Sequence, residues 1–353
     1  MDEVEVVQRL LAAYSPSGHE EAAVRVFTDV ARELGYDVRV DAAGNGRASR
    51  GTGRPRVVYL GHIDTVEGEL PVRRADGRVY GRGACDAKGP LAAALVAGAA
   101  ANVPGSVEII ACVGEETDSR GARAIAQEPP AERLIGGEPN RWDGIGVAYK
   151  GDLRLAAVFD GPRAHLSSPG PSLVEQAIEW VEDLREIGPD DPESAYRSLT
   201  VKLAHLTTQH DGDAERVELV VDLRVPPGVT TASIRKRVEA IDGPTSRTVL
   251  VEIEPWATER TDPVVRALSN AVRAEGGRPT LWRKGGTSDV NLVASAWKRP
   301  CAVYGPGDPH LDHTADESIE EAELRRSVRV LTRAFAELGQ HEPPASAAAP
   351  RPH

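Results

Sequence analysis

The sequence predicts an α/β protein with a large domain and a smaller inserted domain. Apolar, β-branched runs without polar alternation, such as residues 57–60 and 107–113, are typical of strands that are buried on both faces of a sheet. Amphipathic helical patterns alternate with these runs, and the pattern changes near residue 149. The chain of 353 residues is long enough to form two domains with separate cores.

The first domain begins with two predicted helices, over residues 3–13 and 20–35, separated by a turn at residues 15–18. Ser17 precedes Glu20 by three residues, which predicts a capping box at the start of the second helix. Apolar runs then predict the buried strands of this domain, at residues 57–60, 107–113, 134–135 and 300–304.

A different arrangement of elements follows residue 150. The expected strands and helices are those of a two-layer α/β insert: strands at 153–158, 198–206 and 215–225, and helices at 173–187 and 231–241. The chain returns to the first domain near Thr261, with a helix to residue 275 and a closing helix at 319–338. We therefore expect a first domain made of residues 1–149 and 259–340, an insert of 150–258, and a disordered Pro- and Ala-rich tail of 341–353.

Composition excludes several classes of function. The net charge of −12 and the pI near 5.3 argue against nucleic-acid binding. The acidic amino terminus does not resemble a secretory signal, and the most apolar stretch, residues 91–101, is too short to span a membrane. The three cysteines show neither a disulfide framework nor zinc-finger spacing. We expect a cytoplasmic protein without nucleic-acid or membrane partners.

Candidate metal ligands follow the predicted strands. His62 and Asp64 come after the strand at 57–60, and a carboxylate at Asp64 is expected to accept the second ring N–H of His62 and so fix its tautomer. Glu115 and Glu116 follow the strand that ends at Val113. Because open α/β sheets bind ligands at the carboxyl ends of their strands, these loops are expected to meet in one crevice.

Five motifs in a fixed order resemble a known family. They are His62-x-Asp64-Thr-Val, Gly-Arg-Gly-x-x-Asp86-x-Lys-Gly, Glu115-Glu116, Gly-Glu138-Pro and His313-Thr-x-x-Glu. This set resembles the co-catalytic zinc metallopeptidase family that includes acetylornithine deacetylase, succinyl-diaminopimelate desuccinylase, aminoacylase and glutamate carboxypeptidase. The resemblance implies a zinc-exopeptidase-like catalytic domain, with a mixed central sheet flanked by helices, and an inserted lid and dimerisation domain.

The resemblance also implies a role for each ligand. Asp86 would bridge two divalent metal ions, with His62 and Glu138 completing one site and Glu116 and His313 the other. Carboxylates and imidazoles suit zinc, and an anionic bridge offsets the repulsion of two cations roughly 3.5–4 Å apart. Zinc is the expected metal, with cobalt as an alternative. His310 competes with His313 for the late position, and the motif favours His313.

The expected chemistry is amide hydrolysis. Glu115 would act as general base, take a proton from water and return it to the leaving amine, while Asp64 supports the site. His165 resembles the family's lid histidine, which reaches into the active site of the partner subunit of a homodimer and stabilises the oxyanion. The alternative for His165 is an ordinary surface-loop histidine.

Substrate choice rests on a closer resemblance. The segments 83–91, 137–144, 149–151 and 284–291 resemble the branch that releases lysine or ornithine from the terminal glutamate of an acidic amino-group carrier protein, in lysine or arginine biosynthesis. Gly285 departs from this branch, in which a threonine or a similar residue is expected. The candidate substrate-binding residues are Lys284, Gly286, Thr287 and Ser288.

Two other functions stay open at this point. A small-molecule N-acyl-amino-acid deacylase would use the same ligands, and a catalytically silent dimeric binding protein could share the fold. An acidic carrier needs local basic residues on an enzyme of charge −12. The sequence predicts such a docking rim from the following basic residues: Arg73, Arg74, Arg78, Arg82, Arg283 and Lys284.

Overall fold

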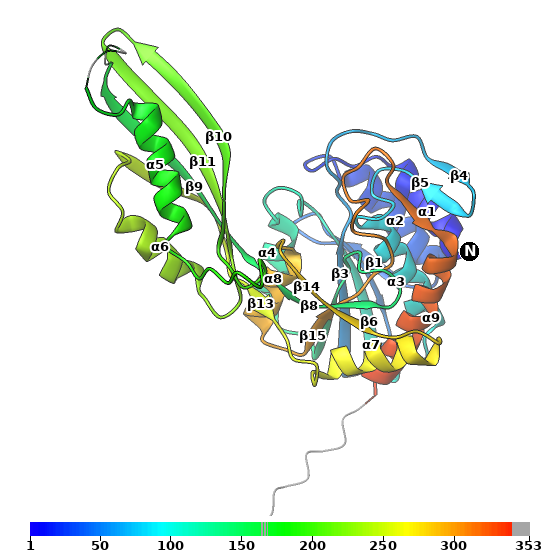
Figure 1. Ribbon diagram of the computed structural model, residues 1–353. Helices are drawn as coiled ribbons and strands as arrows, with labels where there is room; N and C mark the ends of the chain where they lie inside the picture. Colours follow the sequence, from blue (N-terminus) through cyan, green and yellow to red (C-terminus); the bar gives the residue numbers. More distant parts are fainter. Residues whose placement is uncertain (164, 166, 168, 341–353) are drawn as a thin grey trace, which may run out of the picture. The chain divides into compact units, whose positions relative to one another are not determined.

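The computed structural model describes residues 1–163, 165, 167 and 169–340 (Figure 1). The tail of 341–353, for which the sequence predicts disorder, lies outside these residues. The chain forms two compact units: Met1–Val147, Thr258–Trp282 and the part after Ala296 make up the first, and Ala148–Ala257 with Arg283–Ser295 the second. Residues 283–295, which the sequence analysis placed in the first domain, therefore belong by their contacts to the second unit.

A mixed sheet forms the centre of the first unit (Figure 1). β3 (Arg56–His62) lies between β6 (Ser106–Cys112) and β7 (Arg133–Gly136) and runs parallel to both. The strand order is β1 (Asp37–Val40), β2 (Gly46–Arg50), β6, β3, β7, β15 (Cys301–Val303) and β8 (Gly144–Tyr149), and β14 (Thr280–Lys284) also pairs with β8. β2 runs antiparallel to β6, so the sheet is mixed and the α/β fold class is confirmed.

Helices cover this sheet and complete the core. α3 (Lys88–Ala100) is buried over most of its length, which fits its almost wholly apolar sequence. The other helices of this unit are amphipathic or short: α1 (Glu3–Ala12), α2 (Glu21–Glu33), α4 (Arg120–Ala126), α7 (Pro263–Ala274) and α9 (Glu321–Leu338). A small antiparallel sheet of β4 (Arg73–Ala75), β5 (Arg78–Tyr80) and β16 (Ser318–Glu320) places the chain before α9 beside residues 73–80.

The capping box predicted at the start of α2 is wrong. Glu20 occupies the N-cap position without a side-chain capping bond, and its carboxylate instead accepts from the Gly18 N–H and from Arg120. The Ser17 hydroxyl donates to Asp64 Oδ2 at 2.7 Å. A long-range bond to a buried carboxylate has replaced the local cap, because that carboxylate requires donors once it is out of water.

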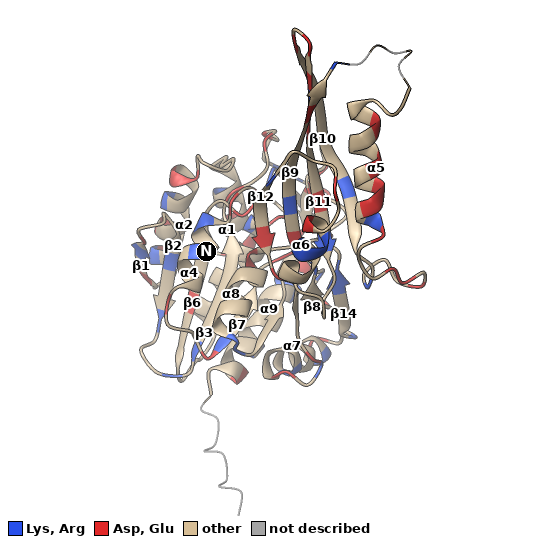
Figure 2. Ribbon diagram, turned by 90° about the vertical axis from the view of Figure 1, so that its left-hand side faces the viewer, with Lys and Arg blue, Asp and Glu red and all other residues tan. Residues whose placement is uncertain are grey.

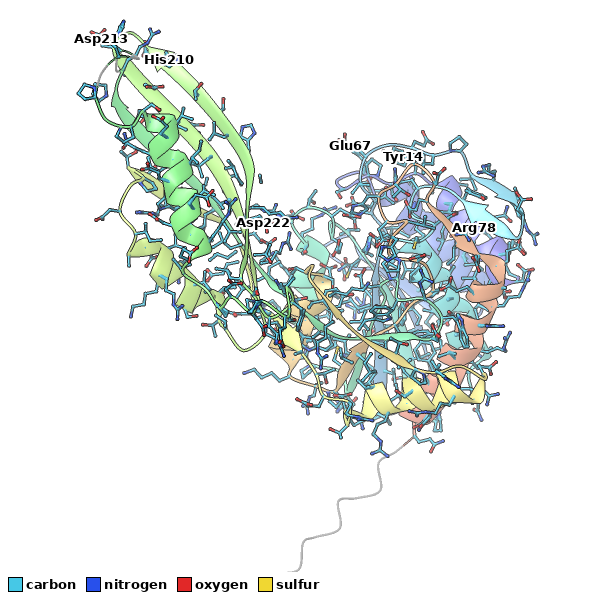
Figure 3. All side chains as sticks on the ribbon, viewed as in Figure 1. Tyr14, Glu67, Arg78, His210, Asp213 and Asp222 are labelled. Carbon is cyan, nitrogen blue, oxygen red and sulfur yellow. The ribbon has the colours of Figure 1, made fainter. Side chains whose placement is uncertain are left out.

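The second unit is a two-layer α/β structure. Its four strands are antiparallel and follow the order β10 (Thr200–Asp211), β11 (Ala214–Val225), β9 (Gly151–Pro162) and β12 (Ser246–Ile253). α5 (Leu173–Arg185) and α6 (Thr231–Glu239) cover one face, where Trp180 and Ile234 pack into an apolar core. Figure 3 shows His210 and Asp213 at the tip of the β10–β11 hairpin, with Asp222 further along β11.

The sequence analysis missed β12 in the sheet of this unit. Its continuous apolar run Val249-Leu250-Val251, followed by Glu252 and Ile253, is rich in β-branched residues, which was a usable strand signal. The second unit also contains β13 (Trp256–Ala257), which pairs with the end of β8, and most of α8 (Asp289–Trp297). Across the described part of the chain, none of the helices combines the length and apolar character that crossing a bilayer requires.

Candidate metal centre and active site

Three parallel strands deliver the candidate ligands to one edge of the sheet. In β3, His62 is the last residue and pairs with Cys112, the last residue of β6. Glu115 and Glu116 follow β6, and Glu138 follows β7 two residues after its end. Because parallel strands end at the same edge, the loops that leave them are neighbours, as the sequence analysis expected.

Asp86 lies at the centre of the cluster that results. Its Oδ1 lies 3.0 Å from His62 Nε2, and its Oδ2 lies 3.1 Å from His313 Nε2. Glu116 Oε1 approaches the same His313 nitrogen at 2.9 Å. Two sets of possible ligand atoms, each within 4.8 Å of one another, share this aspartate: His62, Asp86 and Glu138, and Asp86, Glu116 and His313. His62, Glu115 and Glu116 form a third set.

The charges in this cluster perturb one another. Burial lowers the pKa of His62, but the hydrogen bond to Asp86 and its charge outweigh burial and raise that pKa well above its usual value. Hydrogen bonds to Asp86 and Glu116 raise the pKa of His313 to about 10. Burial opposes ionisation of Asp86, but the two imidazoles reverse this effect and hold its pKa below the ordinary range. Protons on the two histidines thus balance part of the carboxylate charge.

Asp64 organises the loop that carries the two glutamates. Its side chain is fully buried and accepts the main-chain N–H groups of Glu115 and Glu116, each at 3.1 Å, as well as the Ser17 hydroxyl. The predicted bond from His62 to the Asp64 carboxylate is wrong: His62 Nδ1 lies 3.0 Å from the Asp64 main-chain oxygen and 3.8 Å from the carboxylate. The carboxylate instead accepts the main-chain N–H groups of Glu115 and Glu116 and the hydroxyl of Ser17.

Glu317 holds the loop that carries Asp86, and the sequence analysis gave it no role. Its Oε1 accepts the main-chain N–H groups of Gly83, Cys85 and Asp86 at 3.0, 3.0 and 3.1 Å. Its Oε2 accepts from Arg82 Nη1 at 2.9 Å, and both side chains are buried. Glu317 closes the motif His313-Thr-x-x-Glu, so the signal was present in the sequence without indicating the partners.

The late loop brings His313, rather than His310, into the cluster. His313 adopts a left-handed backbone with φ of 61°, which is uncommon for a residue other than glycine. His310 belongs to none of the possible ligand sets found among the described residues. Cys85 is buried, its thiol donates to the Asp308 main-chain oxygen at 3.1 Å, and it belongs to none of the possible ligand sets found among the described residues.

The remaining candidates belong to the second unit, and their roles stay predictions. His165 is exposed, and its Nδ1 accepts the Ser167 N–H at 3.2 Å, which leaves Nε2 to carry the proton in the neutral ring. Thr287 Oγ1 donates to the Lys150 main-chain oxygen and accepts from Arg224. Lys284 lies over the Tyr149 ring at 5.7 Å, Gly286 borders a cavity with Lys150 and Arg224, and Ser288 is buried.

The predicted basic rim is wrong for Arg82, which is buried, and stays a prediction for Arg74 and Arg78, which are partly exposed but form ion pairs. Arg74 forms a two-pronged ion pair with Glu321, and Arg78 pairs with Glu320. Arg82 is buried against Glu317 and binds the main-chain oxygens of Gly68 and Thr314. These positive charges are neutralised within the chain, because β5 and β16 are paired and α9 follows directly.

The donor set fits a pair of metal ions. Two imidazoles and several carboxylates contact one another, and these are the ligand types that zinc prefers. An α/β unit with such a cluster at its strand ends defines a hydrolase of the class that uses two metal ions.

The chain belongs to peptidase family M20/M25/M40, whose sequence pattern matches residues 58–337. Members of this family depend on a pair of metal ions. Because the chain is a member, the protein is a hydrolase that acts on amide bonds. The chain is 33% identical to the "[LysW]-lysine hydrolase" of Deinococcus radiodurans, over 95% of this chain and 96% of the relative. It is 28% identical to the "[LysW]-lysine/[LysW]-ornithine hydrolase" of Sulfurisphaera tokodaii, over 95% of each chain.

Solved structures share the fold. The M20 family metallo-carboxypeptidase Sso-CP2 of Sulfolobus solfataricus superposes with a TM-score of 0.75 at 17% identity, over 96% of this chain and 99% of that one. A tripeptidase of Staphylococcus aureus gives a TM-score of 0.79 at 18% identity, over 96% and 98%. These likenesses confirm the expected α/β architecture.

Proposed function

We propose that the protein hydrolyses the amide bond between lysine or ornithine and the C-terminal glutamate side chain of an amino-group carrier protein, in lysine or arginine biosynthesis. The central observation is that Asp86 is shared by two sets of possible metal ligands, with Glu115 in the adjoining set. The names of the relatives, which refer to a carrier called LysW, support the choice of substrate.

In this proposal His62, Asp86 and Glu138 hold one metal ion, and Asp86, Glu116 and His313 hold the other. Zinc is the proposed metal, with cobalt as an alternative, because the donors are imidazole nitrogens and carboxylate oxygens. When bound, such ions acidify water and polarise a scissile carbonyl. The buried Asp64 and Glu317 keep the ligand loops in place through the main-chain hydrogen bonds that they accept.

Glu115 acts as the general base. Its carboxylate takes a proton from the attacking water molecule while the water oxygen bonds to the amide carbon. The same carboxyl group then donates that proton to the amide nitrogen as the carbon–nitrogen bond breaks, which releases the amino acid as a free amine. Asp64 supports this step, because it fixes the main-chain N–H of Glu115 and of the adjacent Glu116.

The proposal extends to the second unit and to assembly. His165 donates from Nε2 to the developing oxyanion in the active site of the partner subunit, so the working enzyme is a homodimer. Lys284, Gly286, Thr287 and Ser288 contact the substrate. The enzyme works in the cytoplasm, where carrier-linked biosynthesis takes place.

A direct assay tests the substrate. The metal-loaded enzyme is given the carrier protein loaded with lysine or with ornithine, and free amino acid is measured. N-acetylornithine and N-succinyl-diaminopimelate serve as competing small substrates. We expect release from the carrier with a higher kcat/KM than from either small compound, and no release after metal removal. Faster release of acetate or succinate would instead identify a small-molecule deacylase.

A further inference from the structure

The surface of α7 carries arginines without acidic partners. A cavity of about 250 Å³ in the first unit is lined by Arg260, Arg266 and Arg273, together with Pro279 and Leu281, and no carboxylate borders it within the described residues. All three arginines are exposed. We call this region, with the neighbouring Trp282, the α7 arginine surface; Figure 2 shows Lys and Arg in blue.

Among the described residues, no ion pair is formed by the three arginines that line this cavity, although Glu259 and Asp262 are close to them in the sequence. In the described part of the chain, the one side-chain bond of Arg273 goes to the Asn270 amide oxygen at 3.5 Å. Glu275, just beyond α7, is occupied by Arg329 and Arg333 at 2.6 and 2.8 Å. In a chain of net charge −12, three exposed arginines that form no ion pair within the described residues make this part of the surface locally basic.

Exposed apolar side chains lie on the strand that borders the arginines, and Leu281 lines the cavity with them. Leu281 and Trp282 on β14 are 38% and 45% exposed. The Trp282 indole packs against Gly144, where a Cβ atom would come within 2.4 Å of its Nε1. The indole is thus fixed on the segment that follows Glu138, one of the candidate ligands. Arginine and tryptophan are the residue types that contribute most to protein–protein binding energy.

We propose that the α7 arginine surface docks a carboxylate-rich face of the carrier protein; this inference rests on the proposed function. The arginines attract an acidic protein surface, and Leu281 supplies an apolar contact beside them, with Trp282 next to it on the same strand. A nucleic acid fits less well, because its continuous negative charge would extend over the acidic remainder of this chain. A small acidic protein can place its carboxylates against the arginines alone, and charges beyond the Debye length of roughly 10 Å are largely screened.

Charge reversal on α7 tests the docking. Arg266→Glu and Arg273→Glu are combined, two exposed positions seven residues apart on one helix. The control, matched in exposure and spacing, combines Arg25→Glu and Arg32→Glu on α2, where Arg32 forms a surface ion pair with Asp29. The metal-loaded enzymes are assayed with the loaded carrier protein and with the small compound Nα-(γ-glutamyl)-lysine, at low and at high salt.

We expect the α7 variant to raise KM for the carrier about tenfold at low salt, with kcat nearly unchanged. Its kcat/KM for γ-glutamyl-lysine stays within twofold of wild type, its salt dependence for the carrier flattens, and the α2 control resembles wild type. If the wild-type enzyme hydrolyses the carrier conjugate and the α7 variant does so equally well, docking at this surface is refuted while the proposed function stands. If wild type cannot hydrolyse the carrier conjugate, both are refuted. Equal losses in the α7 and α2 variants would show a general charge effect and also refute the inference.

Discussion

Glu317 is expected to stabilise the loop that carries Asp86. Replacing Glu317 by glutamine measures its contribution to the free energy of unfolding. Glutamine keeps one carbonyl oxygen for the N–H groups of Gly83, Cys85 and Asp86, but it removes the charge that pairs with Arg82. Removing one partner of a buried ion pair costs about 3–5 kcal/mol. Arg82 keeps its two main-chain acceptors, so the lower end, about 3 kcal/mol, applies.

Thermal unfolding of the metal-free enzyme provides the assay. At about 2 °C per kcal/mol for a chain of this size, Glu317→Gln lowers Tm by about 6 °C. Glu320→Gln is the control, because Glu320 is 55% exposed in its pair with Arg78 and such surface pairs contribute about 1 kcal/mol or less. Metal affinity should also fall about tenfold in Glu317→Gln, since outer residues orient the ligands. Equal Tm values for the two variants would refute this reasoning.

Three further predictions concern the cluster itself. Glu115→Gln should retain both metal ions, measured by elemental analysis, and lose at least about a hundredfold in kcat; a near-normal rate would rule out the role of general base. His313→Ala should lose metal and activity while His310→Ala keeps both, and the reverse pattern would reassign the ligand. Because the pKa of His313 is raised to about 10, its ring is protonated at neutral pH in the metal-free enzyme, so metal binding must release this proton. Apparent metal affinity should therefore rise from pH 7 to 9 in titration calorimetry, and a constant affinity would contradict the perturbed pKa.

Much of the fold could be predicted because strand signals are local. Runs of β-branched residues fix where β3 and β6 lie, and parallel pairing then brings the loops after them together. The ligand candidates His62, Glu116 and Glu138 therefore meet for a reason that is visible in the sequence. Asp86 and His313 depend on long loops, and they were expected in the cluster only through the family resemblance.

What the sequence did not reveal are the partners of buried polar groups. Ser17 and Glu20 have the spacing of a capping box, but Ser17 instead donates to Asp64, 47 residues away. Arg82 was predicted to take part in docking because it is a basic residue near other arginines in the sequence. In the structure it is buried against Glu317, 235 residues away. Local spacing cannot show such choices, because desolvation decides them only after the chain has collapsed.

The two carboxylate oxygens of Asp64 each accept one main-chain N–H, Oδ1 from Glu115 and Oδ2 from Glu116. The proposed general base, Glu115, and the proposed metal ligand, Glu116, are therefore positioned by the same buried carboxylate, so a shift of one main chain is expected to shift the other. A redesign of the enzyme for a different acyl group should therefore keep Asp64 and the main chain of Glu115 and Glu116 unchanged and vary other loops. An insertion between Gly114 and Thr117 would misalign both functions at once.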